Sequence, residues 1–267
     1  MVASAKMRKA QQSALAGRPY AKLMNSVLAA VSAGAGEFTS PLIEVREVKK
    51  RALVIISTDK GLCGGLNTNL LREATKYDKV STVHVTAGRK ASQYVARTKR
   101  ELAAEFTYKD SPTFAEARAI SKFAQDLFTS GKVDQVDVLY TNFISTMVQK
   151  PDVRQFLPIV EITAVDADVQ GEGAGKSLEQ NTTEYLFEPA ADVVMGSLLP
   201  HYLNFQIYQF LLEAKASEHS ARMVAMKSAT DNANDMIKAL GRLFNRSRQS
   251  QITTELTEIM GGAAALE

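Results

Sequence analysis

The sequence predicts an α/β fold, in which a Rossmann-like, mostly parallel sheet body is joined to a long antiparallel coiled coil formed by the N- and C-terminal helices. Two observations predict it. Apolar runs that suit buried strands alternate with helical segments through the middle of the chain. Both ends instead carry small or apolar residues in steps of four and three, a period that requires a supercoiled helix pair. We therefore expect an N-terminal coiled-coil helix at 1–36, a body at 37–188 and a C-terminal coiled-coil helix at 189–267.

The N-terminal helix carries a stripe made mostly of Ala and Gly. Its members are Ala3, Met7, Ala10, Ala14, Gly17, Ala21, Met24, Leu28 and Val31. The spacing of four and three residues already holds at Ala3, with no lead-in before it. We therefore expect further helical turns upstream in the full-length protein. Pro19 lies inside it and is expected to kink or interrupt the helix.

Charge also distinguishes this end of the chain. From Met1 to Gly36 there are five basic residues and no acidic one, so this end should seek an acidic partner surface. The five are Lys6, Arg8, Lys9, Arg18 and Lys22.

The predicted body alternates strands and helices, which implies a largely parallel sheet. The expected strands are Arg51–Ser57, Val80–Gly88, Gln135–Ser145 and Asp152–Ile159. The expected helices are Leu66–Lys76, Arg89–Arg100 and, after the segment Ala103–Tyr108, Thr113–Gly131.

The C-terminal helix carries the second stripe, which is richer in large side chains. Its members are His219, Met223, Met226, Thr230, Ala233, Ile237, Leu240 and Phe244. Because the two stripes are complementary in size, we expect them to pack against each other. The uncharged stretch Val193–Leu212 is interrupted by polar side chains and is predicted to be a buried helix face, not a membrane span.

Composition limits the possible functions. The net charge of +3 over 267 residues is too mild to indicate a nucleic-acid partner. The single cysteine, Cys63, excludes an internal disulfide and a multi-cysteine metal site, and it fits a reducing compartment. The start has no apolar signal-peptide core, so nothing argues for secretion.

Two glycine-rich stretches resemble nucleotide sites without matching them. Ser57–Asn69 (STDKGLCGGLNTN) follows a strand, but it lacks G-x-G-x-x-G spacing. Cys63 would need a nearby base to act as a nucleophile, and no histidine shows a sequence sign of converging on it. Gly171–Ser177 misses the Walker A pattern by one residue, because Gln170 stands where glycine is required. We expect a structural turn and a surface loop, and no catalytic residue, cofactor or metal.

Four segments together resemble the γ subunit of rotary F-type ATP synthases, and the resemblance covers essentially the whole chain. The segments are MVASAKMRKAQ (1–11), STDKGLCGGLN (57–67), ARMVAMKSATDNA (221–233) and ITTELTEIMGGAAA (252–265). The family carries additional N-terminal helical turns that this sequence lacks.

The resemblance implies a non-catalytic central-stalk rotor. Its coiled coil would fill the axis of the α3β3 hexamer, and its body would contact the ε subunit and the membrane ring of c subunits, while ATP chemistry belongs to β. It also implies contacts with the hexamer, made by Lys6, Arg8, Lys9, Cys63, Arg222, Arg248, Gln249, Thr253 and Glu255. The expected location is peripheral, on the cytoplasmic face of a bacterial inner membrane, with a mitochondrial source left open.

Two other classes of protein remain open from the sequence. One is a Rossmann-type nucleotide-binding enzyme with helical appendages, whose sign would be nucleotide binding or ATP hydrolysis by the isolated chain. The other is a coiled-coil nucleic-acid binder, whose sign would be steeply salt-dependent DNA binding.

Overall fold

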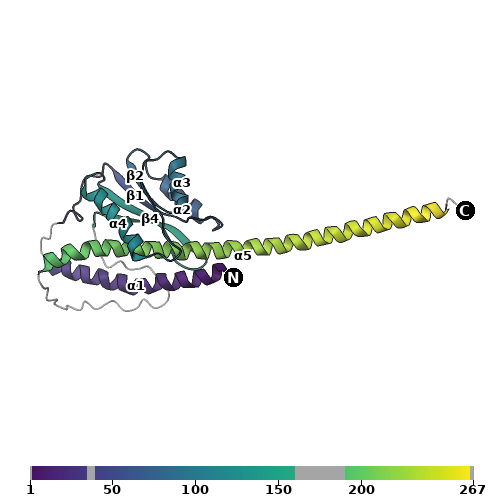
Figure 1. The fold of residues 1–267 in the computed structure, drawn as a ribbon, viewed down its shortest axis with the longest axis horizontal. Helices are drawn as coiled ribbons and strands as arrows, with labels where there is room; N and C mark the ends of the chain where they lie inside the picture. Colours follow the sequence, from purple (N-terminus) through teal and green to yellow (C-terminus); the bar gives the residue numbers. More distant parts are fainter. Residues whose placement is uncertain (1, 35–39, 160–189, 265–267) are drawn as a thin grey trace. The chain divides into compact units, whose positions relative to one another are not determined.

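The computed structural model describes residues 2–34, 40–159 and 190–264, so the predicted loop Gly171–Ser177 lies outside the described residues. It divides into two compact units, Met1–Met223 and Val224–Glu267. The elements, in order, are α1 (Val2–Gly34), β1 (Arg51–Ile56), α2 (Leu66–Thr75), β2 (Thr82–Ala87), α3 (Arg89–Arg97), β3 (Leu102–Phe106), α4 (Phe114–Thr129), β4 (Gln135–Phe143), β5 (Gln149–Leu157) and α5 (Ala191–Ala264) (Figure 1).

The described strands of the first unit form one sheet in the order β3-β2-β1-β4-β5. β1 pairs in parallel with β2 and β4, so that Val54 lies opposite Val85 on one side and Val138 on the other. β2 and β3 are also parallel, whereas β5 runs antiparallel to β4. The prediction of a mostly parallel sheet is confirmed.

The position of β1 in the sheet explains why its residues from Ala52 to Ile56 are all apolar. Ala52, Val54 and Ile56 belong to a core shared with α4 and with the first part of α5. Leu53 and Ile55 point to the opposite face, where α2 and α3 cover them. Because successive side chains of a strand alternate between faces, a strand covered on both sides needs an unbroken apolar run.

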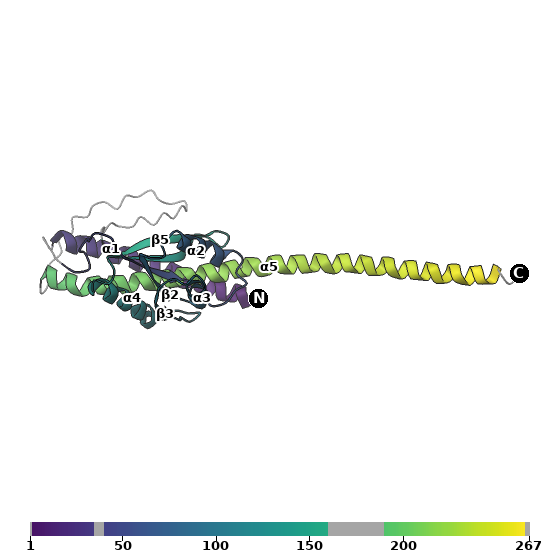
Figure 2. The same ribbon diagram turned by 90° about the horizontal axis from the view of Figure 1, so that it is seen from above.

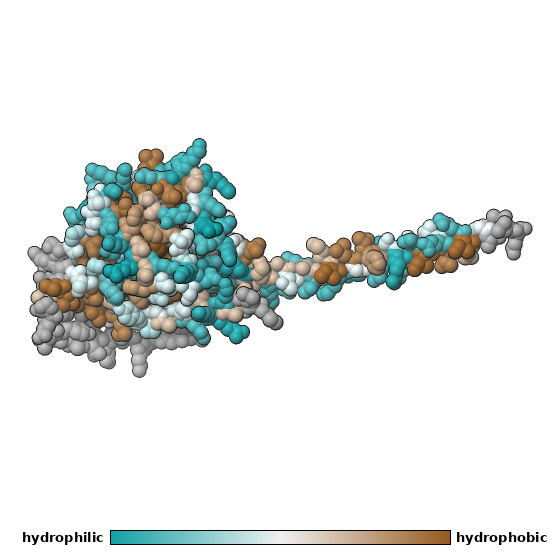
Figure 3. Space-filling view, in the orientation of Figure 1, coloured by the Kyte–Doolittle hydropathy of each residue, from teal (hydrophilic) through white to brown (hydrophobic). Residues whose placement is uncertain are grey.

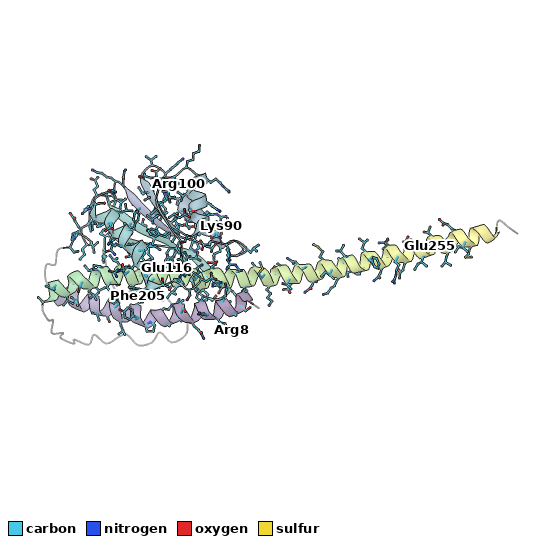
Figure 4. The ribbon with its side chains drawn as sticks, viewed as in Figure 1. Arg8, Lys90, Arg100, Glu116, Phe205 and Glu255 are labelled. Atoms are coloured by element: carbon cyan, nitrogen blue, oxygen red, sulfur yellow. The ribbon has the colours of Figure 1, made fainter. Side chains whose placement is uncertain are left out.

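α1 packs antiparallel along the first part of α5 (Figures 1 and 2). The ring centres of Tyr20 and Phe205 lie 4.5 Å apart, with Phe205 between the two helices (Figure 4). Farther along, Ala14 packs with Leu212 and Ala216. Residue numbers rise along one helix as they fall along the other, which confirms antiparallel pairing of the terminal helices.

The partner of the small-residue stripe differs from the one predicted. Ala14, Met24, Leu28 and Val31 are buried as expected, but they contact the part of α5 that precedes His219. In the predicted partner stripe, the residues from Thr230 to Phe244 are exposed. The described α1 lies alongside the earlier part of α5 over its buried stripe. There, aromatic and leucine side chains of α5 pack against the small residues of α1. The expected burial of Val193–Leu212 is confirmed at Met195, Leu199, Leu203 and Ile207, among others.

Pro19 does not interrupt α1, contrary to the prediction. A proline deprives the carbonyl four residues earlier of its hydrogen bond. Pro19 and Leu15 both lie on the exposed face of α1, so water can satisfy that carbonyl.

The second unit contains the rest of α5. Its side chains are exposed from Lys227 to Gly262, and large apolar residues are spread along it (Figure 3). They are Met236, Ile237, Leu240, Leu243, Phe244, Ile252, Leu256, Ile259 and Met260.

Candidate protein interface

The loop between β1 and α2 is held by its own side chains. The Asn67 Nδ2 group donates to Thr58 Oγ1 at 2.8 Å and to Cys63 Sγ at 3.3 Å. The Thr58 hydroxyl donates to the Lys60 carbonyl at 2.7 Å. These contacts hold the loop in a tight conformation, in which two positions, Leu62 and Gly64, have a positive φ near 60°.

This conformation turns the thiol inward. Cys63 is 2% exposed, whereas the preceding Leu62 is 75% exposed. A partner meeting this loop therefore touches Leu62 and the backbone before it reaches Cys63.

Three of the predicted contact residues lie near the start of α1. Lys6, Arg8 and Lys9 are all exposed, and Arg8 is seen on the free side of the helix in Figure 4. The Lys6 ammonium lies 2.5 Å from an oxygen of Asp110, in the segment between β3 and α4. The pKa of Asp110 is held below its usual range, first by that hydrogen bond from Lys6.

Arg222 on α5 is also engaged inside the first unit. Its guanidinium lies 2.7 Å from Glu218 and donates to the carbonyl of Gly61 at 3.4 Å. The structure thus brings Arg222, a contact residue expected from the resemblance and part of the segment 221–233, against the loop that contains Cys63.

Glu218 continues into a set of charges that the sequence reasoning missed. The Lys215 ammonium lies 3.0 Å from Glu218, 3.7 Å from Asp110 and 4.6 Å from the centre of the Tyr108 ring. We call the five linked residues Lys6, Asp110, Lys215, Glu218 and Arg222 the ionic chain. Their charges alternate in sign, and the chain joins α1, the β3–α4 segment and α5.

Part of the ionic chain could be recognised in the sequence. Lys215, Glu218 and Arg222 are spaced three and four residues apart, which places them on one helix face. The usual interpretation of such a pattern is a solvated surface, yet Lys215 is 2% and Glu218 is 3% exposed. Their burial depends on Tyr108 and Asp110, which lie more than 100 residues away in sequence.

A second polar contact joins α1 to α5 and the sheet. The Arg18 guanidinium donates to the Phe143 carbonyl at 3.1 Å, and Gln209 donates to the Ala14 carbonyl at 3.2 Å and to Glu213 at 3.1 Å. Burial raises the pKa of Glu213 above its usual range. Of the five basic residues expected to face a partner, Arg18 therefore faces inward.

The remaining predicted contact residues, Arg248, Gln249, Thr253 and Glu255, lie in the second unit. All four are exposed, and Figure 4 shows Glu255 projecting from α5. The contacts found for them there are local, from the Thr253 hydroxyl to the Gln249 carbonyl at 2.8 Å and from Gln251 to Glu255 at 3.2 Å. Their outer surfaces are accessible to a partner.

Within 2–34, 40–159 and 190–264, no helix is long and apolar enough to cross a membrane. In the same ranges, no three His, Cys, Asp or Glu side chains are grouped in a way that could hold a metal ion.

Comparison with known proteins gives consistent results. A family model described as ATP synthase matches residues 1–266. A protein named ATP synthase gamma chain from Dehalococcoides mccartyi is 42% identical over 272 residues, covering 100% of this chain and 91% of the relative. Proteins of the same name from Pelotomaculum thermopropionicum and Opitutus terrae are 42% and 43% identical, covering 91% and 88% of those relatives.

Two solved structures with the same fold come from mitochondrial complexes. A chain in the central stalk and c-ring structure of the Tetrahymena thermophila ATP synthase superposes with a TM-score of 0.63 at 22% identity, covering 86% of this chain and 96% of that one. A chain of the Euglena gracilis ATP synthase, from a structure of OSCP, F1 and the c-ring, gives a TM-score of 0.61 at 16% identity, covering 98% and 95%.

Proposed function

The chain belongs to the gamma-chain family of ATP synthase and is a central-stalk subunit, and from this premise we propose that it carries torque from a membrane c ring to the catalytic β subunits of an F-type complex. It is a component of that complex and has no catalytic site of its own. ATP is made or hydrolysed on β, and the turning stalk forces the three β subunits in sequence through their binding states.

The observation that carries this proposal is the exposed apolar surface of α5. The large apolar residues from Met236 to Met260 are between 49% and 70% exposed. A long row of exposed apolar side chains indicates a surface that a partner covers. We propose that the bore of an α3β3 hexamer covers it, since a rotor needs a surface it can turn against.

Polar contacts at two levels would guide that rotation. We propose that Lys6, Arg8 and Lys9 attract acidic lever segments of β, because long-range attraction between charges needs no fixed register. Farther along the stalk, Arg248, Gln249, Thr253 and Glu255 would hydrogen-bond with loops of the hexamer, and Arg248 suits this role because a guanidinium binds carboxylates through two parallel bonds.

The loop near Cys63 and the neighbouring Arg222 would form a third contact, with the lower rim of β. The exposure of Leu62 supports contact by the loop surface. Because the Cys63 thiol is buried, its part in the contact would be to hold the shape of the loop.

The remaining proposed partners of the chain are at the membrane. We propose that the sheet body contacts an ε subunit and the c ring, without crossing the bilayer itself. The relatives named above are bacterial, which supports a peripheral location on the cytoplasmic face of a bacterial inner membrane. Function would then divide along the boundaries expected from the sequence, with helices at 1–36 and 189–267 acting as the stalk and 37–188 as the body.

Reconstitution with α and β subunits tests the proposal. We expect the chain to form a complex with them and to change their ATPase activity. A mixture that forms no complex, with ATPase activity unaffected by this chain, would show the rotor assignment to be wrong. ATP hydrolysis by the isolated chain would instead support the enzyme alternative.

A pair of variants tests the distal contacts within the same assay. Arg248→Ala should lower the ATPase activity of the complex, whereas Arg246→Ala serves as the control because it lies about 200° away around the helix. Equal effects of the two changes would argue against a specific role for Arg248.

A further inference from the structure

The ionic chain holds a charge where an isolated charge would be costly. Lys215 is among the largest fully buried side chains, and its ammonium has two carboxylates and an aromatic ring around it. Removing an ammonium from water costs several kcal/mol unless its partners are well placed. The position of Lys215 is therefore tied to Glu218, Asp110 and Tyr108 together.

These partners come from different parts of the first unit. Glu218 is on α5 itself, but Asp110 and Tyr108 belong to the segment after β3, and Asp110 also contacts Lys6 of α1. A step of one residue along a helix turns the side chain by about 100° and moves it by ~1.5 Å. A rotation or slide of α5 by that amount would carry Lys215 and Glu218 together, but it would part the Lys215 ammonium from Asp110 and from the Tyr108 ring.

Neighbouring hydrogen bonds hold the same turns of α5 against the carboxyl ends of the strands. The Ser217 hydroxyl donates to the Thr141 carbonyl of β4 at 3.1 Å, and Arg222 donates to the Gly61 carbonyl after β1. Tyr108, whose ring faces Lys215, donates its hydroxyl to the Ser57 carbonyl at 2.9 Å. The loop that contains Cys63 is thus tied to Tyr108 at its start, through Ser57, and to Arg222 at its middle, through Gly61.

We propose that Lys215 is a positioning residue that fixes the rotational setting of α5 relative to the sheet body, so that torque applied to the body passes into the stalk without slip. The proposal rests on the proposed rotor function and names the place where body and stalk are coupled. Packing alone would tolerate small rotations of a helix against an apolar surface, whereas the contacts of Lys215 with Asp110 and Tyr108 are made in one setting only.

Angular fluctuation in the assembled complex is the measurement that tests this. The α3β3 hexamer is fixed to a surface, rotation is stopped with a non-hydrolysable nucleotide, and a bead is attached to the body through Val80→Cys. Val80 is 84% exposed and Cys63 is 2% exposed, so the label goes to position 80. The variance of the bead angle reports torsional stiffness between hexamer and body.

Lys215→Met should raise that variance roughly twofold or more, because the setting of α5 is no longer specified. Lys215→Arg should stay near the original value, since it keeps the charge. Lys76→Met is the matched control, because the exposed Lys76, which directly follows α2, forms a similarly short pair with Glu73 at 2.6 Å.

A second variant separates positioning from stability. In Lys215→Met, Glu218 keeps its pair with Arg222 and Asp110 keeps its pair with Lys6, so neither carboxylate is left without a cation. Asp110→Asn removes only the ionic contact between α5 and the β3–α4 segment and leaves Lys215 paired with Glu218, so it should also raise the angular variance while thermal stability stays near that of the original chain. The original variance in Asp110→Asn would overturn the proposal. If the original chain itself did not assemble with α and β, the proposed function would fail instead.

Discussion

At the scale of single residues, Gly88 shows the strictest local requirement. It follows β2 with φ of 105°, and a Cβ at this position would overlap the carbonyl oxygen of Ser57. Its own N–H donates to Phe106 at 2.9 Å, which joins β2 to the end of β3. Only glycine satisfies both the backbone angle and the close approach.

We expect Gly88→Ala to destabilise the first unit by about 3 kcal/mol or more, since it adds backbone strain to a steric overlap. Gly61→Ala is the matched control, because a Cβ there meets nothing within 4 Å, and it should change stability by less than about 0.5 kcal/mol. Urea denaturation of both variants measures the difference. Similar losses would contradict this account of Gly88.

His219 gives a residue-scale prediction about pH. Its side chain is buried, and its pKa is lowered first by loss of solvation and then by Lys215 and Arg222, against the opposing effect of Glu218 and Asp110. The unfolded chain therefore takes up this proton before the folded chain does. The corresponding stability is present above about pH 6.5 and is lost as the pH falls through the folded-state pKa.

His219→Gln should remove this contribution. Thermal melting of the variant should depend less on pH than that of the original chain between pH 7.5 and 5, with the two curves diverging below about pH 6.5. Parallel melting curves across that range would show that His219 does not titrate as its burial implies.

At the scale of elements, the pairing of α1 with α5 depends on small residues. A Cβ on Gly17 would overlap the Gln209 side-chain oxygen, and the Gln209 amide donates to the Ala14 carbonyl. The two helices can approach closely because the side chain at position 17 is absent.

We expect Gly17→Leu to destabilise the first unit by about 1–3 kcal/mol through overpacking, even though leucine favours helix more than glycine does. Ala16→Leu, which adds bulk to the exposed neighbouring position, should have an effect within about 0.5 kcal/mol. Chemical denaturation of the isolated chain compares them. A neutral Gly17→Leu variant would mean that the helices do not need this approach.

Most elements of the body could be predicted from the sequence because local signals agree with the tertiary structure there. The expected helix Thr113–Gly131 corresponds to α4, and Thr113 is its N-cap, with Glu116 completing a capping box. Both signals lie within a few residues of each other, so no distant contact is needed to interpret them.

The partner of the N-terminal stripe could not be predicted in the same way. Several stretches of α5 match its period, and periodicity does not say which of them lies alongside. The ionic chain was missed for a related reason, since the spacing of Lys215, Glu218 and Arg222 is visible in the sequence but their burial by Tyr108 is not.

At the scale of the whole molecule, α5 has two different environments along one helix. From Leu199 to Ser220 it contributes buried side chains to the first unit, whereas from Lys227 to Gly262 it is exposed. Helical hydrogen bonds without tertiary cover open readily, because no apolar burial opposes their opening.

Amide hydrogen exchange should reveal this division. In the isolated chain, we expect amides from Val224 to Ala264 to exchange orders of magnitude faster than those from Leu199 to Ser220. In the reconstituted complex with α and β, the exchange of the distal segment should slow toward that of the buried part. Unchanged exchange in a complex that has demonstrably formed would mean that the distal segment is not covered by the hexamer.

The continuity of α5 also affects how its distal part becomes helical. An isolated helix in water must first pay for an unfavourable nucleus, and even good helix-forming sequences are marginal. Here the turns between Leu199 and Ser220 are already fixed by the core, so residues beyond Met223 can extend an existing helix one hydrogen bond at a time. The subunit can therefore offer a preformed template to its partners, and less conformational entropy is left to lose when they close around it.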